Sequence, residues 1–357
     1  MYGVHELLDK PLAFSEKTKK KYVKPTSRFP ILIGKQALNV EIFEGKTNSD
    51  SPILLMVHGL CESIETKGIQ ALVTTARAKK MKVACLELEG MGFSSSDKDK
   101  MRCGDFEKHL SNVLLFIKKT VQHMRGKGSD APYFIVGNGF GGILCLYASE
   151  LISRMKEAFP VNFKGVAAIA PIVSIKEAFD PSLSSVVTNS LLSSVMPFLA
   201  TELSVHESTY NCPDRSTRNY SGKLPLTISK MLFDLTTKVH NDIENGELKL
   251  VGVSNVLIFG GNDDKLVPIR RIEAFFNSIK PRRKLLVNMG RGHDMLHHRN
   301  SAIPLLDKLY SWVEEITDLD KENNNANAFW DVKAQTPLVD RPFESENREQ
   351  VEQPISV

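Results

Sequence analysis

The stretch Tyr133-Phe-Ile-Val-Gly137-Asn-Gly139-Phe-Gly-Gly142 decides the fold, because an apolar run ends there in four glycines within six residues. A short apolar run bounded by glycines is typical of a strand buried on both faces of a parallel sheet. Helical spacing follows at once, over residues 142–158. A strand that turns directly into a helix is the repeating unit of α/β proteins, whose functional residues lie where the strands end. The glycines therefore mark a candidate site.

Similar strands and helices alternate on both sides of this stretch. One segment, Leu38 to Phe43, alternates apolar and polar residues with period two. Further short apolar runs end in polar or Gly-rich turns; they are Pro52–Val57, Lys82–Leu88, Gly165–Ile169, Val256–Phe259 and Lys284–Val287. Helical spacing occupies three more segments, 105–125, 270–279 and 301–317. Strands that alternate with helices predict the α/β class, with a mostly parallel, doubly wound sheet.

The chain divides into five parts. We expect residues 172–252, where the alternation breaks, to form a mostly helical cap inserted between two halves of the core, 31–171 and 253–317. Residues 1–30 hold seven basic side chains against three acidic ones, which predicts a solvated basic arm with weak affinity for an anionic membrane surface. Residues 318–357 hold nine acids against four bases and few aliphatics, so we expect an acidic, disordered tail.

The composition excludes several classes of protein. With 42% hydrophobic and 25% charged residues the chain is globular, and its net charge of +4 is too small to predict binding to nucleic acid. No charge-free apolar run reaches the length of a membrane span, and the N-terminus lacks the apolar core of a signal peptide. The five cysteines are scattered without metal-ligand spacing, which predicts thiols in a reducing compartment and a cytoplasmic protein.

Polar residues follow three other strand ends. The segment Leu257-Ile-Phe-Gly-Gly-Asn-Asp263-Asp264-Lys-Leu-Val-Pro268 carries two acids, and Leu285-Leu-Val-Asn-Met-Gly-Arg-Gly-His293-Asp294 carries a histidine. An earlier strand end reads His58-Gly-Leu-Cys-Glu-Ser63. The order of a glycine-flanked elbow, then an acid, then a histidine matches the triad order of α/β hydrolases.

These motifs, together with Gly90-Met-Gly-Phe-Ser-Ser95, resemble the monoacylglycerol lipase and lysophospholipase branch of the α/β hydrolases, often described as serine aminopeptidase-like. The resemblance covers roughly residues 30–316 and implies an α/β-hydrolase fold with a helical cap. It implies Asp264 as the acid, because the family's acid is followed by two residues and then Val-Pro, with Asp263 as the rival. It also implies His293 as the general base.

One position departs from the family pattern. The resemblance implies that the backbone N–H groups of Leu60 and Phe140 form an oxyanion hole and that the elbow reads Gly-x-Ser-x-Gly, but residue 139 is glycine. Acyl transfer needs an atom that attacks a carbonyl, and glycine has none. Glycine also adopts the positive φ of the elbow without strain. We therefore expect a fold that is retained and serine chemistry that is lost.

Three other interpretations use the same segments. Gly137-x-Gly139-x-x-Gly142 satisfies a dinucleotide fingerprint, but the next predicted strand ends in Ala-Pro171 without the acid that would hold a ribose. His293-Asp-Met-Leu-His297, with the neighbouring His298, imitates a zinc-binding helix, but no third ligand is evident. Cys61 lies beside the implied oxyanion hole and is a candidate substitute nucleophile, although a lone cysteine is more often a small apolar core residue. We expect no cofactor and no metal.

The substrate class is indicated by the predicted cap alone. An apolar cluster there that includes Leu192, Met196 and Leu199 either packs the cap on the sheet or, as the resemblance implies, admits acyl chains. The favoured hypothesis is a silenced lipase-like protein that binds a monoacylglycerol or lysophospholipid-like molecule, or a protein partner. The alternatives are a working esterase that uses Cys61, substrate assistance or a water activated by His293, and a sequence variant of an active lipase.

Overall fold

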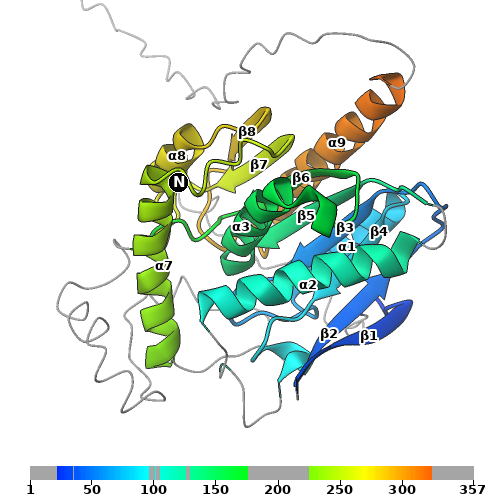
Figure 1. Ribbon diagram of the computed structural model, residues 1–357, viewed down its shortest axis with the longest axis horizontal. Coiled ribbons are helices and arrows are strands. Elements are labelled where there is room, and N and C mark those ends of the chain that lie inside the picture. Colours follow the sequence, from blue (N-terminus) through cyan, green and yellow to red (C-terminus); the bar gives the residue numbers. More distant parts are fainter. Residues whose placement is uncertain are drawn as a thin grey trace, which may run out of the picture.

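The computed structural model describes residues 22–34, 36–95, 101, 105–125, 129–175 and 225–323 (Figure 1). In this part of the chain eight strands form one sheet, in the order β1-β2-β4-β3-β5-β6-β7-β8. The strands are β1 (Ser27–Ile33), β2 (Gln36–Phe43), β3 (Ile53–Val57), β4 (Lys82–Leu86), β5 (Tyr133–Asn138), β6 (Phe163–Ile169), β7 (Asn255–Gly260) and β8 (Arg283–Asn288).

The sheet is mostly parallel. Strands β3 to β8 run in one direction, whereas β1 and β2 are antiparallel to their neighbours at one end. Every residue of β3, β4, β5 and β7 is buried, as a sheet covered on both faces requires. The prediction of an α/β, mostly parallel and doubly wound sheet is confirmed.

Helices cover both faces of the sheet (Figure 1). Alternate residues of β3 enter opposite cores: Leu55 and Val57 pack with α2 (Phe106–Arg125), α3 (Phe140–Arg154) and α8 (Ile269–Ser278). Leu54 and Met56 pack instead with α1 (Lys67–Ala78) and α9 (Arg299–Asn323). Each face of the sheet thus has its own apolar layer.

One strand and one helix cross boundaries between the predicted parts of the chain. Strand β1 begins at Ser27, inside the predicted basic arm 1–30, because Arg28 pairs with the buried carboxylate of Glu41 on β2, at 2.8 Å between Nε and Oε1. Helix α9 continues to Asn323 and so includes the start of the predicted tail 318–357, because Val313 and Ile316 keep it on the apolar layer.

Part of the predicted cap is described. Within residues 172–252, helix α7 (Leu226–Glu244) packs Ile228 and Leu232 into the same apolar cluster as α3. Residues 176–224, which include Leu192, Met196 and Leu199, lie outside the described residues, as do 1–21 and 324–357. Among the described helices, none combines the length and the apolar character needed to cross a membrane.

Close backbone approach fixes the start of α3. A Cβ on Gly141 would lie 2.3 Å from the carbonyl oxygen of Val57 on β3, and a Cβ on Gly137 would lie 2.2 Å from the carbonyl oxygen of Gly141. No side chain fits at either distance, so these two glycines allow α3 to begin directly against β3 and β5.

We therefore expect Gly141→Ala to destabilise the fold by at least about 1–3 kcal/mol, the usual cost of overpacking a tight core. The measurement is the urea midpoint of unfolding. Gly292→Ala is the matched control, because its Cβ would meet its nearest atom, Asp294 Oδ1, at an ordinary 3.5 Å. Equal midpoints for the two variants would contradict this account of the α3 junction.

Candidate active site

The carboxyl ends of four strands meet at one edge of the sheet, since β3, β5, β7 and β8 are parallel. The loops that leave these ends carry His58–Ser63, Gly139, Asp264 and His293, respectively. Segments that are far apart in the sequence are brought together there.

Gly139 forms the turn between β5 and α3. Its φ is 53° and its ψ is −112°, a conformation that L-residues rarely adopt. Its N–H donates to the carbonyl of Ile169 at 2.8 Å, and its carbonyl accepts from the N–H of Ile172 at 3.2 Å. A Cβ built on Gly139 would lie 3.3 Å from His293 Nε2 and 3.9 Å from Gly59 Cα. A side chain at position 139 would therefore point at the imidazole.

Asp264, and not Asp263, contacts His293. The Asp264 side chain is fully buried, and its Oδ2 accepts from His293 Nδ1 at 2.9 Å. Its other oxygen, Oδ1, accepts from the N–H groups of Leu266 at 2.9 Å and Val267 at 2.8 Å. Asp263 is exposed to solvent, and its N–H donates to the carbonyl of Arg291. The carboxylate thus has three donors that fix both its position and the ring of His293.

The charge of His293 is controlled by its neighbours. Burial of the ring lowers the pKa, but the carboxylates of Asp264, Asp294 and Glu62 outweigh it, so that the pKa of His293 is raised above its ordinary value. Because Asp264 accepts the Nδ1 proton, Nε2 of the neutral ring has its lone pair toward position 139.

The backbone N–H groups of Leu60 and Phe140 belong to residues just beyond the ends of β3 and β5, respectively. Leu60 follows Gly59 in the loop after β3, and Phe140 is the first residue of α3. Both residues are buried, at 7% and 0% exposure. Within the described residues, neither N–H has a hydrogen-bond acceptor. Buried N–H groups without an acceptor are rare, and a helix N-terminus favours a negative charge, so both suit a ligand oxygen.

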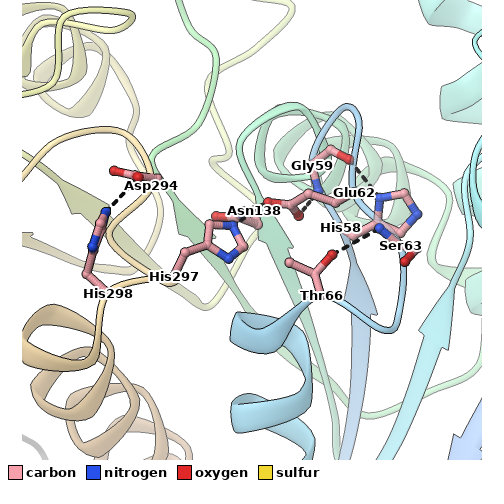
Figure 2. A network of polar contacts seen from close by, with 9 residues as sticks. All are labelled: His58, Gly59, Glu62, Ser63, Thr66, Asn138, Asp294, His297 and His298. Carbon is pink, nitrogen blue, oxygen red and sulfur yellow. Dashed lines mark hydrogen bonds and ion pairs between the residues drawn. The ribbon is translucent and has the colours of Figure 1, made fainter. Parts of the chain in front are cut away.

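Glu62 joins three of the loops (Figure 2). Its Oε2 accepts from the N–H of Gly59 at 2.7 Å, and its Oε1 accepts from Asn138 Nδ2 at 2.9 Å and from His297 Nε2 at 2.6 Å. The Glu62 carboxylate therefore links its own loop, at Gly59, with the end of β5, at Asn138, and with the segment that follows His293, at His297. The sequence interpretation did not single out Glu62, because nothing near it in the chain indicates these partners.

These contacts keep Glu62 ionised. Burial raises the pKa of Glu62, but the charge and hydrogen bond of His297 and the N–H of Gly59 outweigh it, so that the pKa is lowered to about 2. His58 is held in turn: its Nδ1 donates to the carbonyl of Gly59 at 2.7 Å and its Nε2 accepts from the N–H of Leu88 at 3.2 Å. Burial lowers the pKa of His58, which suits this neutral ring.

The histidines of the zinc hypothesis lie in other surroundings than a zinc site requires, and the candidate nucleophile Cys61 lies in the loop after β3. His297 pairs with Glu62, and His298 Nε2 lies 2.7 Å from Asp294 Oδ2, so that the two rings point to separate acids (Figure 2). Among the described side chains, no three of His, Cys, Asp and Glu gather as a metal site. Cys61 is buried in the loop beside Leu60 and has a positive φ of 63°.

Comparison with known proteins agrees with the geometry. Residues 49–300 match the family described as serine aminopeptidase, S33. The chain belongs to this family of hydrolases. A comparison with curated proteins found no match to the chain.

Solved structures share the α/β-hydrolase fold with this chain. A soluble variant of monoglyceride lipase from Saccharomyces cerevisiae, in complex with a substrate analog, superposes with a TM-score of 0.64 at 16% identity over 84% of this chain and 98% of its own. Monoacylglycerol lipase from Paleococcus ferrophilus gives 0.58 at 16% identity over 79% and 98%. A thermostable carboxyl esterase from Bacillus coagulans, in complex with glycerol, gives 0.61 at 13% identity over 83% and 100%.

The links made by Glu62 predict a pH-dependent contribution to stability. Glu62→Gln should lower the free energy of unfolding by about 1–3 kcal/mol at pH 7, because an amide cannot accept from all three buried donors. The folded pKa of about 2 lies below the ordinary value of 4.5, so the carboxylate's contribution is complete above pH 4.5 and is lost as the pH falls toward 2.

The difference between wild type and Glu62→Gln should therefore shrink from pH 6 to pH 3.5 in urea titrations. Glu157→Gln is the control, since Glu157 is exposed, and it should stay within about 0.5 kcal/mol of wild type. A difference that is constant over this pH range would show that Glu62 is not the buried anion described above.

Proposed function

We propose that the chain is a lipase-like S33 hydrolase that has lost its nucleophile and binds a lipid or acyl-ester molecule without cleaving it efficiently. The observation that carries the proposal is the geometry at Gly139, where a Cβ would lie 3.3 Å from His293 Nε2. In α/β hydrolases this elbow position holds the nucleophile. Glycine at this position has no atom that could attack a carbonyl.

The remaining groups have the roles of an acyl-transfer site in this proposal. Asp264 holds the ring of His293 through Nδ1 and favours its protonated form. His293 is the general base, with Nε2 directed at position 139. The N–H groups of Leu60 and Phe140 are the oxyanion hole, which would accept the developing charge of a tetrahedral intermediate. Oxyanion stabilisation and binding without a nucleophile leave a residual rate of about 10³–10⁴-fold over water.

The ligand class is supported by the fold relatives. The yeast monoglyceride lipase was solved with a substrate analog and the Bacillus coagulans esterase with glycerol. We propose a small lipid or ester of the monoacylglycerol or lysophospholipid type as the ligand of this chain. The described cysteines, Cys61, Cys85 and Cys145, are buried thiols, which supports the proposal that the protein works in a reducing compartment such as the cytoplasm.

A working hydrolase is the second candidate. Within the described residues, Nε2 of His293 has no hydrogen-bond partner, and a water bound there would be placed to lose a proton. If this mechanism operates, wild-type protein hydrolyses esters at rates typical of enzymes and His293→Ala abolishes that activity. Under the favoured proposal, wild type and His293→Ala have the same very low rate.

Restoring the nucleophile tests the favoured proposal directly. Gly139→Ser should place a hydroxyl within reach of His293 and raise hydrolysis of short-chain aryl esters by at least tenfold over wild type. Recovery will be partial, because serine at a positive φ is strained by roughly 1–3 kcal/mol and misplacement by about 1 Å can cost on the order of 10²-fold in rate. The measurements are the hydrolysis rate and covalent labelling by a fluorophosphonate.

Two matched variants isolate the hydroxyl. Gly139→Ala adds the same Cβ and backbone strain without an oxygen, and it should be as inactive as wild type. The double variant Gly139→Ser with His293→Ala should lose the gained activity. A folded Gly139→Ser protein that neither hydrolyses esters nor reacts with the fluorophosphonate would contradict the assignment of Gly139, His293 and Asp264 to one acyl-transfer site.

A further inference from the structure

Three polar groups without a partner belong to residues around Gly139: Leu60 follows Gly59, Phe140 follows Gly139, and His293 Nε2 lies 3.3 Å from a Cβ built on Gly139. Within the described residues, the N–H of Leu60, the N–H of Phe140 and Nε2 of His293 have no hydrogen-bond partner. The first two can only donate, and the third donates once the ring is protonated. A ligand that satisfies all three must present more than one acceptor atom.

Glycine at position 139 leaves room for those acceptors. At Gly137 and Gly141 an added Cβ would meet backbone at 2.2 and 2.3 Å, whereas at Gly139 it would meet only His293 Nε2, at 3.3 Å, and Gly59 Cα, at 3.9 Å. On the side of residue 139 that faces the imidazole, a carbon atom would be tight at 3.3 Å from Nε2, whereas an oxygen atom at this distance can accept a hydrogen bond from the ring. In a serine enzyme the Oγ atom occupies this direction.

We propose that the strand-end site around Gly139 binds the carboxylate of a free fatty acid in preference to an intact ester. This inference deepens the proposed function and rests on it, since the acyl character of the ligand comes from there. One carboxylate oxygen accepts from the N–H groups of Leu60 and Phe140, and the other accepts from Nε2–H of His293.

The carboxylate matches the site better than an ester does. The ester group offers one good acceptor, its carbonyl oxygen, which pairs with the two N–H groups, so the ester group makes no charge-assisted hydrogen bond to the imidazole. A carboxylate offers two equivalent oxygens, and its hydrogen bonds to a protonated imidazole and to a helix N-terminus are charge-assisted. Phe140 is the first residue of the 15-residue helix α3, so its N–H lies at the positive end of the helix dipole.

Binding of a carboxylate at this site is coupled to the protonation of His293. Asp264 accepts the Nδ1 proton, so Nε2 can donate to the ligand only when His293 carries two protons. The carboxylates that face His293 are Asp264 and Glu62 from other loops and Asp294 from its own loop. All three carboxylates stabilise the imidazolium form of His293. They also repel the carboxylate of a ligand, unless His293 takes up a proton when the ligand binds. The bound state therefore contains one proton more than neutral His293 and free carboxylate do.

The affinity should consequently depend on pH. Below the pKa of His293 the ring is already protonated and binding is insensitive to pH. Above it, each bound carboxylate takes up one proton, and the affinity should fall by about tenfold per pH unit. A monoacylglycerol, which has hydroxyl groups that can donate to neutral His293, should show no such slope.

Isothermal titration calorimetry with decanoate, 1-decanoylglycerol and methyl decanoate tests the proposal. The ten-carbon acid stays ionised from pH 6 to 9, so any proton uptake belongs to the protein. Titrations in two buffers of different ionisation enthalpy count the protons. At pH 6 we expect decanoate to bind at least tenfold more tightly than either ester, and at pH 9 we expect uptake of close to one proton per decanoate.

Two variants and one control separate the site from general effects. His293→Ala should weaken decanoate binding at pH 6 by tenfold or more and abolish proton uptake, while methyl decanoate binding changes by less than about threefold. Gly139→Ala, which fills the open side of residue 139, should also weaken decanoate binding. His240→Ala, at an exposed position on α7, should leave the affinity and the proton count of wild type unchanged.

The outcomes also distinguish this inference from the proposed function. Tighter binding of 1-decanoylglycerol than of decanoate would overturn the preference for a free acid and leave a lipid-binding protein. Decanoate binding that takes up no proton, or that persists in His293→Ala, would overturn the assigned site. If none of the three compounds binds, the lipid-binding function itself fails.

Discussion

The sharp turn at Gly139 is the constraint on which the rest of the site depends. The chain leaves β5 and enters α3 within one residue, at a φ of 53°, and the glycines at 137 and 141 let the first turn of α3 rest on the backbone of β3 and β5. This close approach places the N–H of Phe140 at the strand ends, beside the loop that carries Leu60. The same turn aims residue 139 at His293. Backbone packing thus fixes the N-terminal end of α3, which favours a negative charge, independently of any side chain.

The conformation of residue 139 connects stability with chemistry. A serine there would be strained by roughly 1–3 kcal/mol, and an enzyme retains that strain because the hydroxyl is needed. Glycine adopts the same φ without strain. The turn with glycine at position 139 is therefore more stable than the same turn with serine. Stability at this position and acyl transfer are therefore opposed, and under the proposed function the chain has the stable form of the turn and not the reactive one.

The sequence predicted the sheet well wherever burial is uniform. The runs that became β3, β5 and β7 are apolar on both faces, which a parallel interior strand requires, but β1 is a half-exposed edge strand beside basic residues and was missed. The family resemblance implied Asp264 and His293 as acid and base, and in the structure a hydrogen bond of 2.9 Å joins the two side chains. Glu62 was not predicted, because its partners Asn138 and His297 lie 76 and 235 residues away and a carboxylate in a loop usually faces solvent.

The site residues differ in how far the fold depends on them. Asp264 accepts from the backbone of Leu266 and Val267 as well as from His293, and Glu62 ties three loops together, so replacing either leaves buried donors without acceptors. A side chain at position 139 would touch only His293 Nε2 and Gly59 Cα. Among the described residues of this group, position 139 is thus the one at which the packing needs no side chain. Under the proposed function, an intact acid and histidine are therefore a weak sign of catalysis in this chain, because folding alone is sufficient to retain the acid and its hydrogen bond. Residue 139 instead determines whether a nucleophile is present.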